Sequence, residues 1–545
     1  MKIKFLKYSI ILLLSFPFFS CSKLNLAPTN EFTELNYWTT IDNANYVLNT
    51  AYSQMFNSTA MIDNEFLTDN TFEGRGGDES EIVTGVANAS IGRFANEWSS
   101  CYAGIKTCNI FMANVGNVPV MPDSLKSLMI AQARFIRAFL YFRLANWFGD
   151  VPFFTQDITL DESKTIDRTP YAKVISFVHS ELDDVATILP AKGQYTASGV
   201  GRITRGAAVA LNARVYLYDN DWQNVVKYCE MLINTTNYGS YSLYPNYANL
   251  FKPQGQNSSE DILDMQYAPG ASSTRNWSDM FDLIPITCGG RVNQAAPTQE
   301  LVDSYIMANG LPITAAGSGY DPGNPYTGRD PRLEATIVHH LSSIVQRGGT
   351  TSHLIYTQPG STTDPNFTPD LYVGGGSNST ATGYYYRKLY DSSALDGMAS
   401  GMNLMLIRYA DILLMEAEAK NELGQMDATV WNNTINPIRV RAGFTVSSAL
   451  DFPAVSQDSL RSIIRNERRS EFALEGTRVF DIRRWKLSET VLNGYPHGAQ
   501  FGDPTIDNGF LRLTKRTFNP QRDYLWPIPQ SQMDLDPNLT QNPNY

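Results

Sequence analysis

Residues 204–233 read TRGAAVALNARVYLYDNDWQNVVKYCEMLI, and this stretch decides the fold. Its first half, residues 204–218, combines apolar residues at helical spacing with many alanines, which predicts a helix that a neighbour can approach closely. Asp219-Asn220-Asp221 then supplies the polar residues of a turn. Residues 222–233 return to the helical pattern, so the stretch predicts two helices folded back on each other.

A similar pair recurs at residues 404–423 and 426–441, with Gly424 as the helix stop between them. Both pairs resemble tetratricopeptide units, in which two helices span about 30 residues and small side chains occupy the first helix. Because such pairs bury their apolar stripes only against one another, several must stack into a helical scaffold.

Helical spacing predicts further helices at residues 43–56, 96–115, 124–147, 170–189 and 458–484. We expect Thr169 to be the N-cap of the helix that starts at Pro170. In contrast, Gly, Ser, Asn, Pro and Tyr dominate residues 235–400, a stretch too long to be an empty loop.

The predicted fold class is therefore mainly α, a tetratricopeptide-like helical-pair scaffold with an inserted, irregular, loop-rich ligand-binding subdomain. The expected divisions are an N-terminal helical region at 36–234, the irregular insertion at 235–400, and a C-terminal helical region with an extended tail at 401–545. Binding residues tend to lie on loops that a rigid scaffold presents, so we expect the ligand at the insertion.

The first 20 residues have the pattern of a secretory signal peptide. Lys2, Lys4 and Lys7 precede an apolar run at 8–19 that is shorter than the ~20 residues of a membrane span. Ser20-Cys21 resembles a bacterial lipoprotein cleavage site, so Cys21 is expected to carry the lipid anchor and residues 21–35 to form a tether. Phe18 stands where such sites usually have Leu, and ordinary secretion with Cys21 incidental is the alternative.

The net charge of the chain indicates which classes of partner it can bind, and its cysteines are considered with it. Removing residues 1–20 takes away three lysines and no acids, so the formal net charge moves from −11 to −14. Such an acidic chain repels phosphate backbones, which argues against nucleic-acid binding. We expect Cys101, Cys108, Cys229 and Cys288 to be buried as small apolar residues rather than paired.

The sequence contains no recognisable catalytic motif. The five histidines are dispersed, and no H-E-x-x-H, G-x-S-x-G or G-x-x-x-x-G-K-[ST] motif occurs. We therefore predict no catalytic residue, no cofactor and no metal site. A surface glycosidase needs only two suitably spaced carboxylates, and it stays open as the less favoured alternative.

Several motifs resemble the SusD/RagB family. They include Arg408-Tyr409-Ala410-Asp411 with Asn421-Glu422-Leu423-Gly424, Glu467-Arg468-Arg469-Ser470-Glu471, Arg483-Arg484-Trp485 and Tyr524-Leu525-Trp526-Pro527. Phe148-Gly149-Asp150-Val151-Pro152 and Ala213-Arg214-Val215-Tyr216-Leu217 fit in the same order upstream. The resemblance runs over almost the whole chain beyond the signal peptide.

The resemblance implies an outer-membrane lipoprotein that faces the cell exterior and caps a SusC-like TonB-dependent transporter. Members hand the transporter glycans, or peptides in the RagB branch, and both ligand classes remain open here. Ser22-Lys23-Leu24-Asn25 follows the cysteine, where surface-displayed lipoproteins of these bacteria often carry acidic residues.

Glycan capture asks for exposed aromatic rings that stack on sugar C–H faces, with polar groups at the rim. Trp277 in a Gly/Ser-rich stretch is the first choice. The other candidates are Tyr267, Phe281, Arg291, Asn293, Phe72, Arg75 and Trp98. For Trp277 and Trp98, packing in the core is the open alternative.

The charged residues of the family motifs have a structural interpretation. Charges that lie among apolar residues must pair, because an unpaired buried charge is costly. We therefore expect a network formed by Arg408, Asp411, Glu416, Glu467, Arg468, Glu471, Arg478, Asp481, Arg483 and Arg484.

Overall fold

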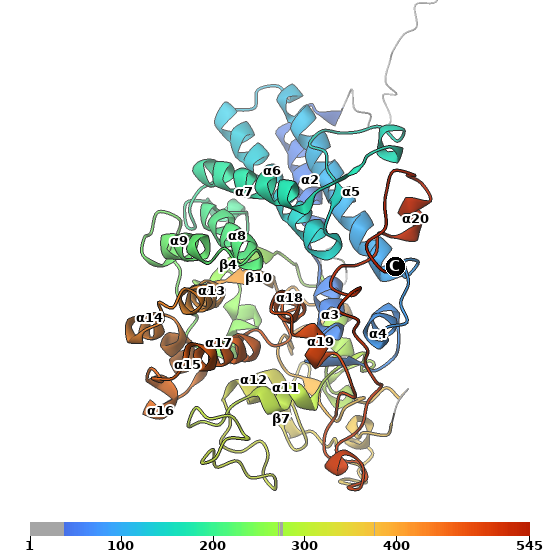
Figure 1. Ribbon diagram of the computed structural model, residues 1–545, viewed down its shortest axis with the longest axis vertical. Helices are drawn as coiled ribbons and strands as arrows, with labels where there is room; N and C mark the ends of the chain where they lie inside the picture. Colours follow the sequence, from blue (N-terminus) through green and yellow to red (C-terminus); the bar gives the residue numbers. More distant parts are fainter. Residues whose placement is uncertain (1–36, 271, 273–275, 375–376) are drawn as a thin grey trace, which may run out of the picture.

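The computed structural model describes residues 37–545 except 271, 273–275 and 375–376. Its long helices stack one against the next in chain order (Figure 1). They are α2 (Ile41–Ser53), α5 (Gly92–Asn114), α6 (Asp123–Phe148), α7 (Tyr171–Ile188), α8 (Arg205–Tyr218), α9 (Trp222–Ile233), α13 (Tyr409–Glu422) and α17 (Gln457–Glu471). The mainly helical, paired scaffold predicted from the sequence is confirmed.

Shorter helices connect and cover this stack. They are α3 (Ser58–Phe66), α4 (Asp78–Thr84), α10 (Tyr247–Leu250), α11 (Gln299–Ser304), α12 (Arg332–Thr336), α14 (Ala428–Asn433), α15 (Ile435–Ala442), α16 (Ser447–Leu450), α18 (Arg478–Arg484), α19 (Ser488–Val491) and α20 (Gln530–Met533).

The strands form small antiparallel sheets of two strands each. The pairs are β1 (Thr71–Glu73) with β5 (Ala295–Pro297), β2 (Val151–Pro152) with β3 (Arg168–Thr169), β4 (Asp261–Met265) with β10 (Leu404–Arg408), β6 (Ile337–Val338) with β9 (Tyr385–Tyr386), and β7 (Ser343–Val345) with β8 (Ser352–Leu354). Most of the insertion consists of these strands, short helical turns and loops.

The alanine-rich helix α8 shows why the scaffold stacks. Ala207, Ala208, Ala210 and Ala213 are all fully buried, because α8 contacts α7, α9 and α13. Side chains of this size let the helix axes approach closely. The α8–α9 hairpin has the predicted bounds, and the four cysteines are buried and unpaired as expected.

Several boundaries differ from the sequence predictions. The helix expected at 426–441 is divided at Thr434 into α14 and α15. Residues 404–408 are strand β10 and not helix, because they pair with β4 across the insertion. The helix expected at 458–484 is broken into α17 and α18, where Leu474 and Gly476 adopt positive φ angles of 66° and 74°. Thr169 lies in β3 and is not the N-cap of α7, which begins at Tyr171.

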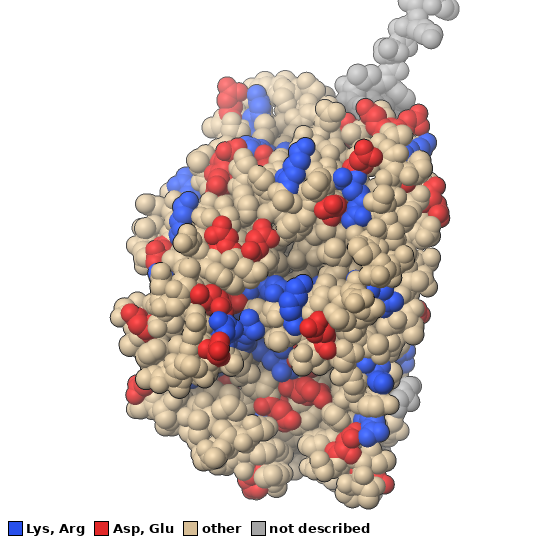
Figure 2. All heavy atoms as spheres, viewed as in Figure 1, with Lys and Arg blue, Asp and Glu red and all other residues tan. Residues whose placement is uncertain are grey.

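The motif charges form the predicted buried network. Arg468 pairs with Asp411 and Asp481 at 2.5 and 2.8 Å, and Arg484 pairs with Glu418 at 2.6 Å. Figure 2 shows a group of basic side chains in the middle of this face, around α17 and α18, with acidic groups beside them, while other basic side chains are scattered over the rest of the face.

Two members of the expected network do not join it. Arg483 donates to the backbone carbonyls of Asp523, at 3.0 Å, and Tyr524 instead of a carboxylate. The buried Oε2 of Glu416 has no hydrogen-bond partner in the described part of the chain. Within those residues, no helix is both long and apolar enough to cross a bilayer.

Candidate ligand-binding site

An open hollow of about 680 Å³ lies between α2, the start of α3 and the segment that follows β4. We call it the polar hollow. It is lined by Tyr46, Asn49, Thr50, Ser53, Asn57, Ser58, Thr59, Tyr267, Asn276, Trp277, Ser278 and Asp279.

One wall of the polar hollow is a single face of α2. Tyr46, Asn49, Thr50 and Ser53 follow one another at helical spacing and therefore point to the same side. The opposite face of α2 buries Ala44, Leu48 and Ala51 in the core. The helix is therefore fixed by its buried face. Tyr46, on the other face, is 61% exposed.

The second wall is joined to α3 by hydrogen bonds. The hydroxyls of Ser58 and Thr59 donate to Oδ2 of Asp279 at 2.7 and 3.1 Å. The backbone N–H of Ser58 donates to the Tyr267 hydroxyl at 3.2 Å. These bonds hold the segment after β4 against the first turn of α3, so the walls are preorganised.

Asp279 is the only charged side chain among the described residues that line the polar hollow. Burial raises the pKa of the neighbouring Asp63 to about 6, and the negative charge of Asp279 adds to the rise while Arg93 opposes it. The described part of the lining is therefore weakly acidic and rich in hydroxyl and amide groups. Such a lining suits a neutral ligand with many hydroxyls and disfavours an anionic one.

Trp277 does not provide the exposed ring that the sequence suggested. It is 2% exposed, and its indole Nε1 donates to the Met402 carbonyl at 2.9 Å. Its backbone exchanges two hydrogen bonds with Ser400, which draws the side chain into the core. Trp277 thus lines the floor of the polar hollow, whereas Tyr267 is half-buried in its wall.

The other candidate residues of the insertion differ in their exposure to solvent. Phe281 and Asn293 are buried, at 0% and 1% exposed, so neither presents a surface to a ligand. The Asn293 side chain instead donates to the Ala295 carbonyl at 3.0 Å. Arg291 is exposed and forms an ion pair with Asp282 at 2.7 Å.

Phe72 and Arg75 belong to the β1 region. Phe72 is half-buried opposite Ala296, and Arg75 is exposed and donates to the Asn378 side chain. The Asn293 N–H donates to the Asn378 carbonyl at 2.9 Å, so Asn378 brings Arg75 and Asn293 together. This group is not part of the polar hollow lining.

Trp98 lies on α5, is 4% exposed and packs in the core, which was the alternative to an exposed binding role. It contributes to the wall of a separate groove of about 410 Å³, together with Tyr102 and Phe154. Cys21 lies outside the described residues.

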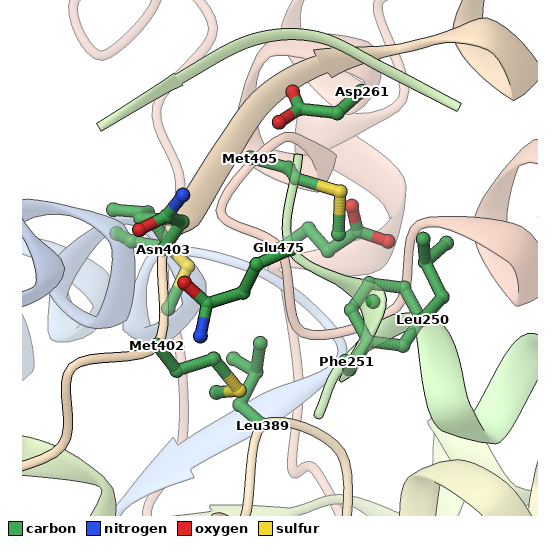
Figure 3. A pocket seen from close by; sticks show the side chains of 12 residues that line it. Leu250, Phe251, Asp261, Leu389, Met402, Asn403, Met405 and Glu475 are labelled. Atoms are coloured by element: carbon green, nitrogen blue, oxygen red, sulfur yellow. The ribbon is translucent and has the colours of Figure 1, made fainter. Parts of the chain in front are cut away.

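A third cavity, drawn in Figure 3, is too small for a ligand. Leu250, Phe251, Leu389, Met402 and Met405 converge on a volume of about 10 Å³. That space is close to the minimum of about 10–15 Å³ for one water molecule. It is a packing void beside β10.

Sequence reasoning missed the α2 wall and Asp279. The signal was present, because Tyr46, Asn49, Thr50 and Ser53 make a stripe at helical spacing with an aromatic residue on the polar face. Such a stripe cannot be told from an ordinary solvated helix face without the segment that faces it.

Comparison with known protein families shows to which family the chain belongs. The family model described as "SusD family" matches residues 254–545. The chain belongs to the SusD family. A second model, described as "Starch-binding associating with outer membrane", matches residues 24–217 of the same chain.

Individual relatives of the SusD family extend over almost the full length. A SusD-like protein P2 of Formosa agariphila is 25% identical over 551 residues, covering 98% of both chains. A crystal structure of a SusD-like carbohydrate binding protein from Bacteroides fragilis superposes with a TM-score of 0.82 at 29% identity, covering 92% of this chain and 100% of that one. A second SusD-like protein of the same species gives 0.78 at 26% identity, over 95% and 100%.

SusD-like glycan-binding proteins are non-catalytic. A ligand site in such a protein therefore needs only to hold a ligand in place. Within the described residues, no three His, Cys, Asp or Glu side chains are placed to share a metal ion.

Proposed function

We propose that this chain is a surface lipoprotein that binds oligosaccharides in the polar hollow and delivers them to a partner SusC-like TonB-dependent transporter. The observation that carries the proposal is the pairing of an exposed Tyr46 ring, on a helix packed against the core, with a rim of hydroxyl, amide and carboxylate groups.

A pyranose ring has two kinds of surface that this lining matches. Its apolar C–H face stacks on a tyrosine ring, and its hydroxyl edge needs donors and acceptors in fixed positions. Oδ1 of Asp279 can accept from a sugar hydroxyl while Oδ2 holds Ser58 and Thr59. Asn49 and Thr50 lie one helical turn from Tyr46 and supply amide and hydroxyl groups.

The relatives support this ligand class and this location. One related structure is titled a carbohydrate binding protein, and the N-terminal half matches a family described as starch-binding and associated with the outer membrane. Acylation of Cys21 would hold the chain at that membrane, since the hydrophobic contribution of about 0.8 kcal/mol per methylene accumulates over several acyl chains.

An open hollow buries only part of a sugar chain, so binding is expected to be modest and reversible. Reversible binding is what delivery requires, because the ligand must leave for the transporter.

Titration of short oligosaccharides tests the binding step. We expect the substitutions Tyr46→Ala and Asn49→Ala to weaken binding of hexasaccharides, such as maltohexaose or laminarihexaose, at least about tenfold each, which is about 1.4 kcal/mol. Tyr495→Ala is the matched control, because Tyr495 is 47% exposed but does not line the hollow. Equal affinities for wild type and both hollow variants would overturn the assignment of the site.

A matching titration with peptides separates the rival function. Binding of peptides but of no glycan would indicate a RagB-like role. Delivery is tested by co-purification from outer membranes: wild type should bring down a TonB-dependent transporter, whereas Cys21→Ser should leave the membrane fraction.

A further inference from the structure

A second cluster of aromatic side chains lies on the loop-rich part of the molecule. Its members come from three segments and form a chain of ring contacts. They are Phe501, His340, Tyr356, Phe367 and His353, and successive ring centroids are 6.2, 6.1, 5.7 and 6.5 Å apart. All five side chains are partly exposed. We call them the aromatic row.

The backbone holds the aromatic row firmly. His353 lies on β8, and the β7–β8 hairpin begins at a turn in which Leu341 takes a positive φ of 64°. The Leu341 N–H donates to the Ile355 carbonyl at 2.7 Å, and the Ile355 N–H, directly after β8, donates to the Ser342 carbonyl at 2.9 Å. A bulky residue in this conformation is strained, and such strain persists only where the surroundings fix it.

Phe501 is fixed in a different way. Its ring packs on Gly383, where a Cβ would lie 2.8 Å from Cε2 of the ring. Because Gly383 also has a φ of 87°, a side chain at that position is excluded twice. The ring therefore has a backbone surface on one side, and its position does not depend on a mobile neighbour.

His340 places a polar group in the middle of the row. Its Nδ1 accepts the backbone N–H groups of Thr357 and Gln358 at 3.2 and 3.3 Å. Burial and the adjacent His339 lower the pKa of His340, so the imidazole is neutral near pH 7. An acceptor at Nδ1 puts the single ring proton on Nε2, which makes Nε2 a hydrogen-bond donor.

From this geometry we propose that the aromatic row is a second glycan-binding surface, which holds a neighbouring stretch of the same neutral polysaccharide that enters the polar hollow. This inference rests on the proposed function. The ring spacing is comparable to the length of one sugar unit. Neighbouring ring planes are turned by 42–82° from one another, so successive units can contact successive rings by a face or by an edge. The neutral His340 Nε2–H can donate to a sugar hydroxyl without favouring an anion.

The two surfaces are formed by different parts of the chain and share no residue. Figure 1 places β7 in the lower, loop-rich part of the molecule and α2 near the top, well separated along the long axis. The inference requires that a hexasaccharide in the polar hollow does not reach the aromatic row, whereas a polysaccharide does. Two linked contacts then raise the apparent affinity without any new contact in the hollow.

The test compares long and short ligands of one sugar type. Wild type, Tyr356→Ala/Phe367→Ala and Tyr46→Ala are titrated with soluble starch and maltohexaose, and with laminarin and laminarihexaose. The aromatic-row variant is expected to bind the polysaccharide about tenfold more weakly while its hexasaccharide affinity stays within about twofold. Tyr216→Ala is the matched control, because Tyr216 is also partly exposed and stacks on a histidine, but on α8.

Unchanged polysaccharide affinity in the aromatic-row variant overturns the inference, and so does an equal loss for long and short ligands in a variant with wild-type melting temperature. If the double variant does not fold, the single substitution Phe367→Ala is used with the same criteria. Failure of the proposed function has a different signature: Tyr46→Ala then leaves hexasaccharide binding unchanged, or no glycan of the set binds wild type.

Discussion

Nη1 of Arg408 lies 2.5 Å from Oε1 of Glu471, and this ion pair joins strand β10 to the end of helix α17. Both side chains are almost fully buried, and Arg408 also pairs with Glu260 at 2.8 Å. Glu260 directly precedes β4, the strand that leads into the wall of the polar hollow. The network therefore positions the ligand site from behind.

Removing one partner of this pair should destabilise the whole chain. Glu471→Gln leaves the positive charges of Arg408, Arg441 and Arg332 without their shared carboxylate, for an expected loss of about 3–5 kcal/mol. Urea unfolding followed by circular dichroism measures it. Lys164→Met, which removes an exposed pair with Asp161, is the control and should change stability by less than about 1 kcal/mol. Similar small effects for both would contradict a structural role for the network.

The same network predicts loss of stability in acid. Burial alone would raise the pKa of Asp411, but Arg468 and Arg214 outweigh it and hold that pKa well below the usual range. The pKa of Glu471 is held low in the same way by Arg441, Arg408 and Arg332. A carboxyl group whose pKa is lowered in the folded state stabilises the fold at pH values above its unfolded pKa of about 4. The fold loses that stabilisation as the pH falls. The melting temperature should therefore drop steeply below about pH 4, and a flat profile there would contradict the pairing.

Glu416 should behave in the opposite way. Burial raises its pKa to about 7, and the nearby Glu230 adds to the rise while Lys420 opposes it. A raised carboxyl pKa makes the folded state less stable as the pH increases from the unfolded value of about 4.3 toward 7. Glu416→Gln should therefore stabilise the chain by up to about 3 kcal/mol at pH 8 and have little effect at pH 4. Melting curves at the two pH values decide this, and a stabilisation that is equal at both would refute it.

Trp277 is expected to matter for folding more than for affinity. Trp277→Phe keeps most of the buried ring but removes the bond to the Met402 carbonyl, so we expect a loss of about 1 kcal/mol. Hexasaccharide binding should stay within about twofold of wild type, because the ring face is not exposed. A large drop in affinity at unchanged stability would show that Trp277 contacts the ligand.

The long helices could be predicted because their signals are local. The helices at 205–218 and 222–233 carry clear periodicity and end at polar turn residues. Strand β10 was missed because Leu404–Arg408 runs into α13 without a breaker, and only pairing with the distant β4 makes it a strand. The break at Leu474 was invisible for a similar reason, since a leucine with positive φ carries no sequence signal.

The site was harder to predict than the fold. Sequence alone directs attention to aromatic residues in loops, yet Trp277 and Phe281 are buried by contacts with segments far along the chain. Tyr46 is exposed on a regular helix, and Asp279, which lines the same hollow, is more than 200 positions away in the sequence. Exposure of a loop residue depends on tertiary contacts, and a single sequence does not encode it locally.

A crystal structure of the protein with a bound oligosaccharide would show whether the polar hollow holds the ligand. We expect a sugar ring stacked on Tyr46, with a hydroxyl within hydrogen-bond distance of Asp279. An oligosaccharide bound elsewhere at full occupancy, with only solvent between α2 and the segment after β4, would contradict it.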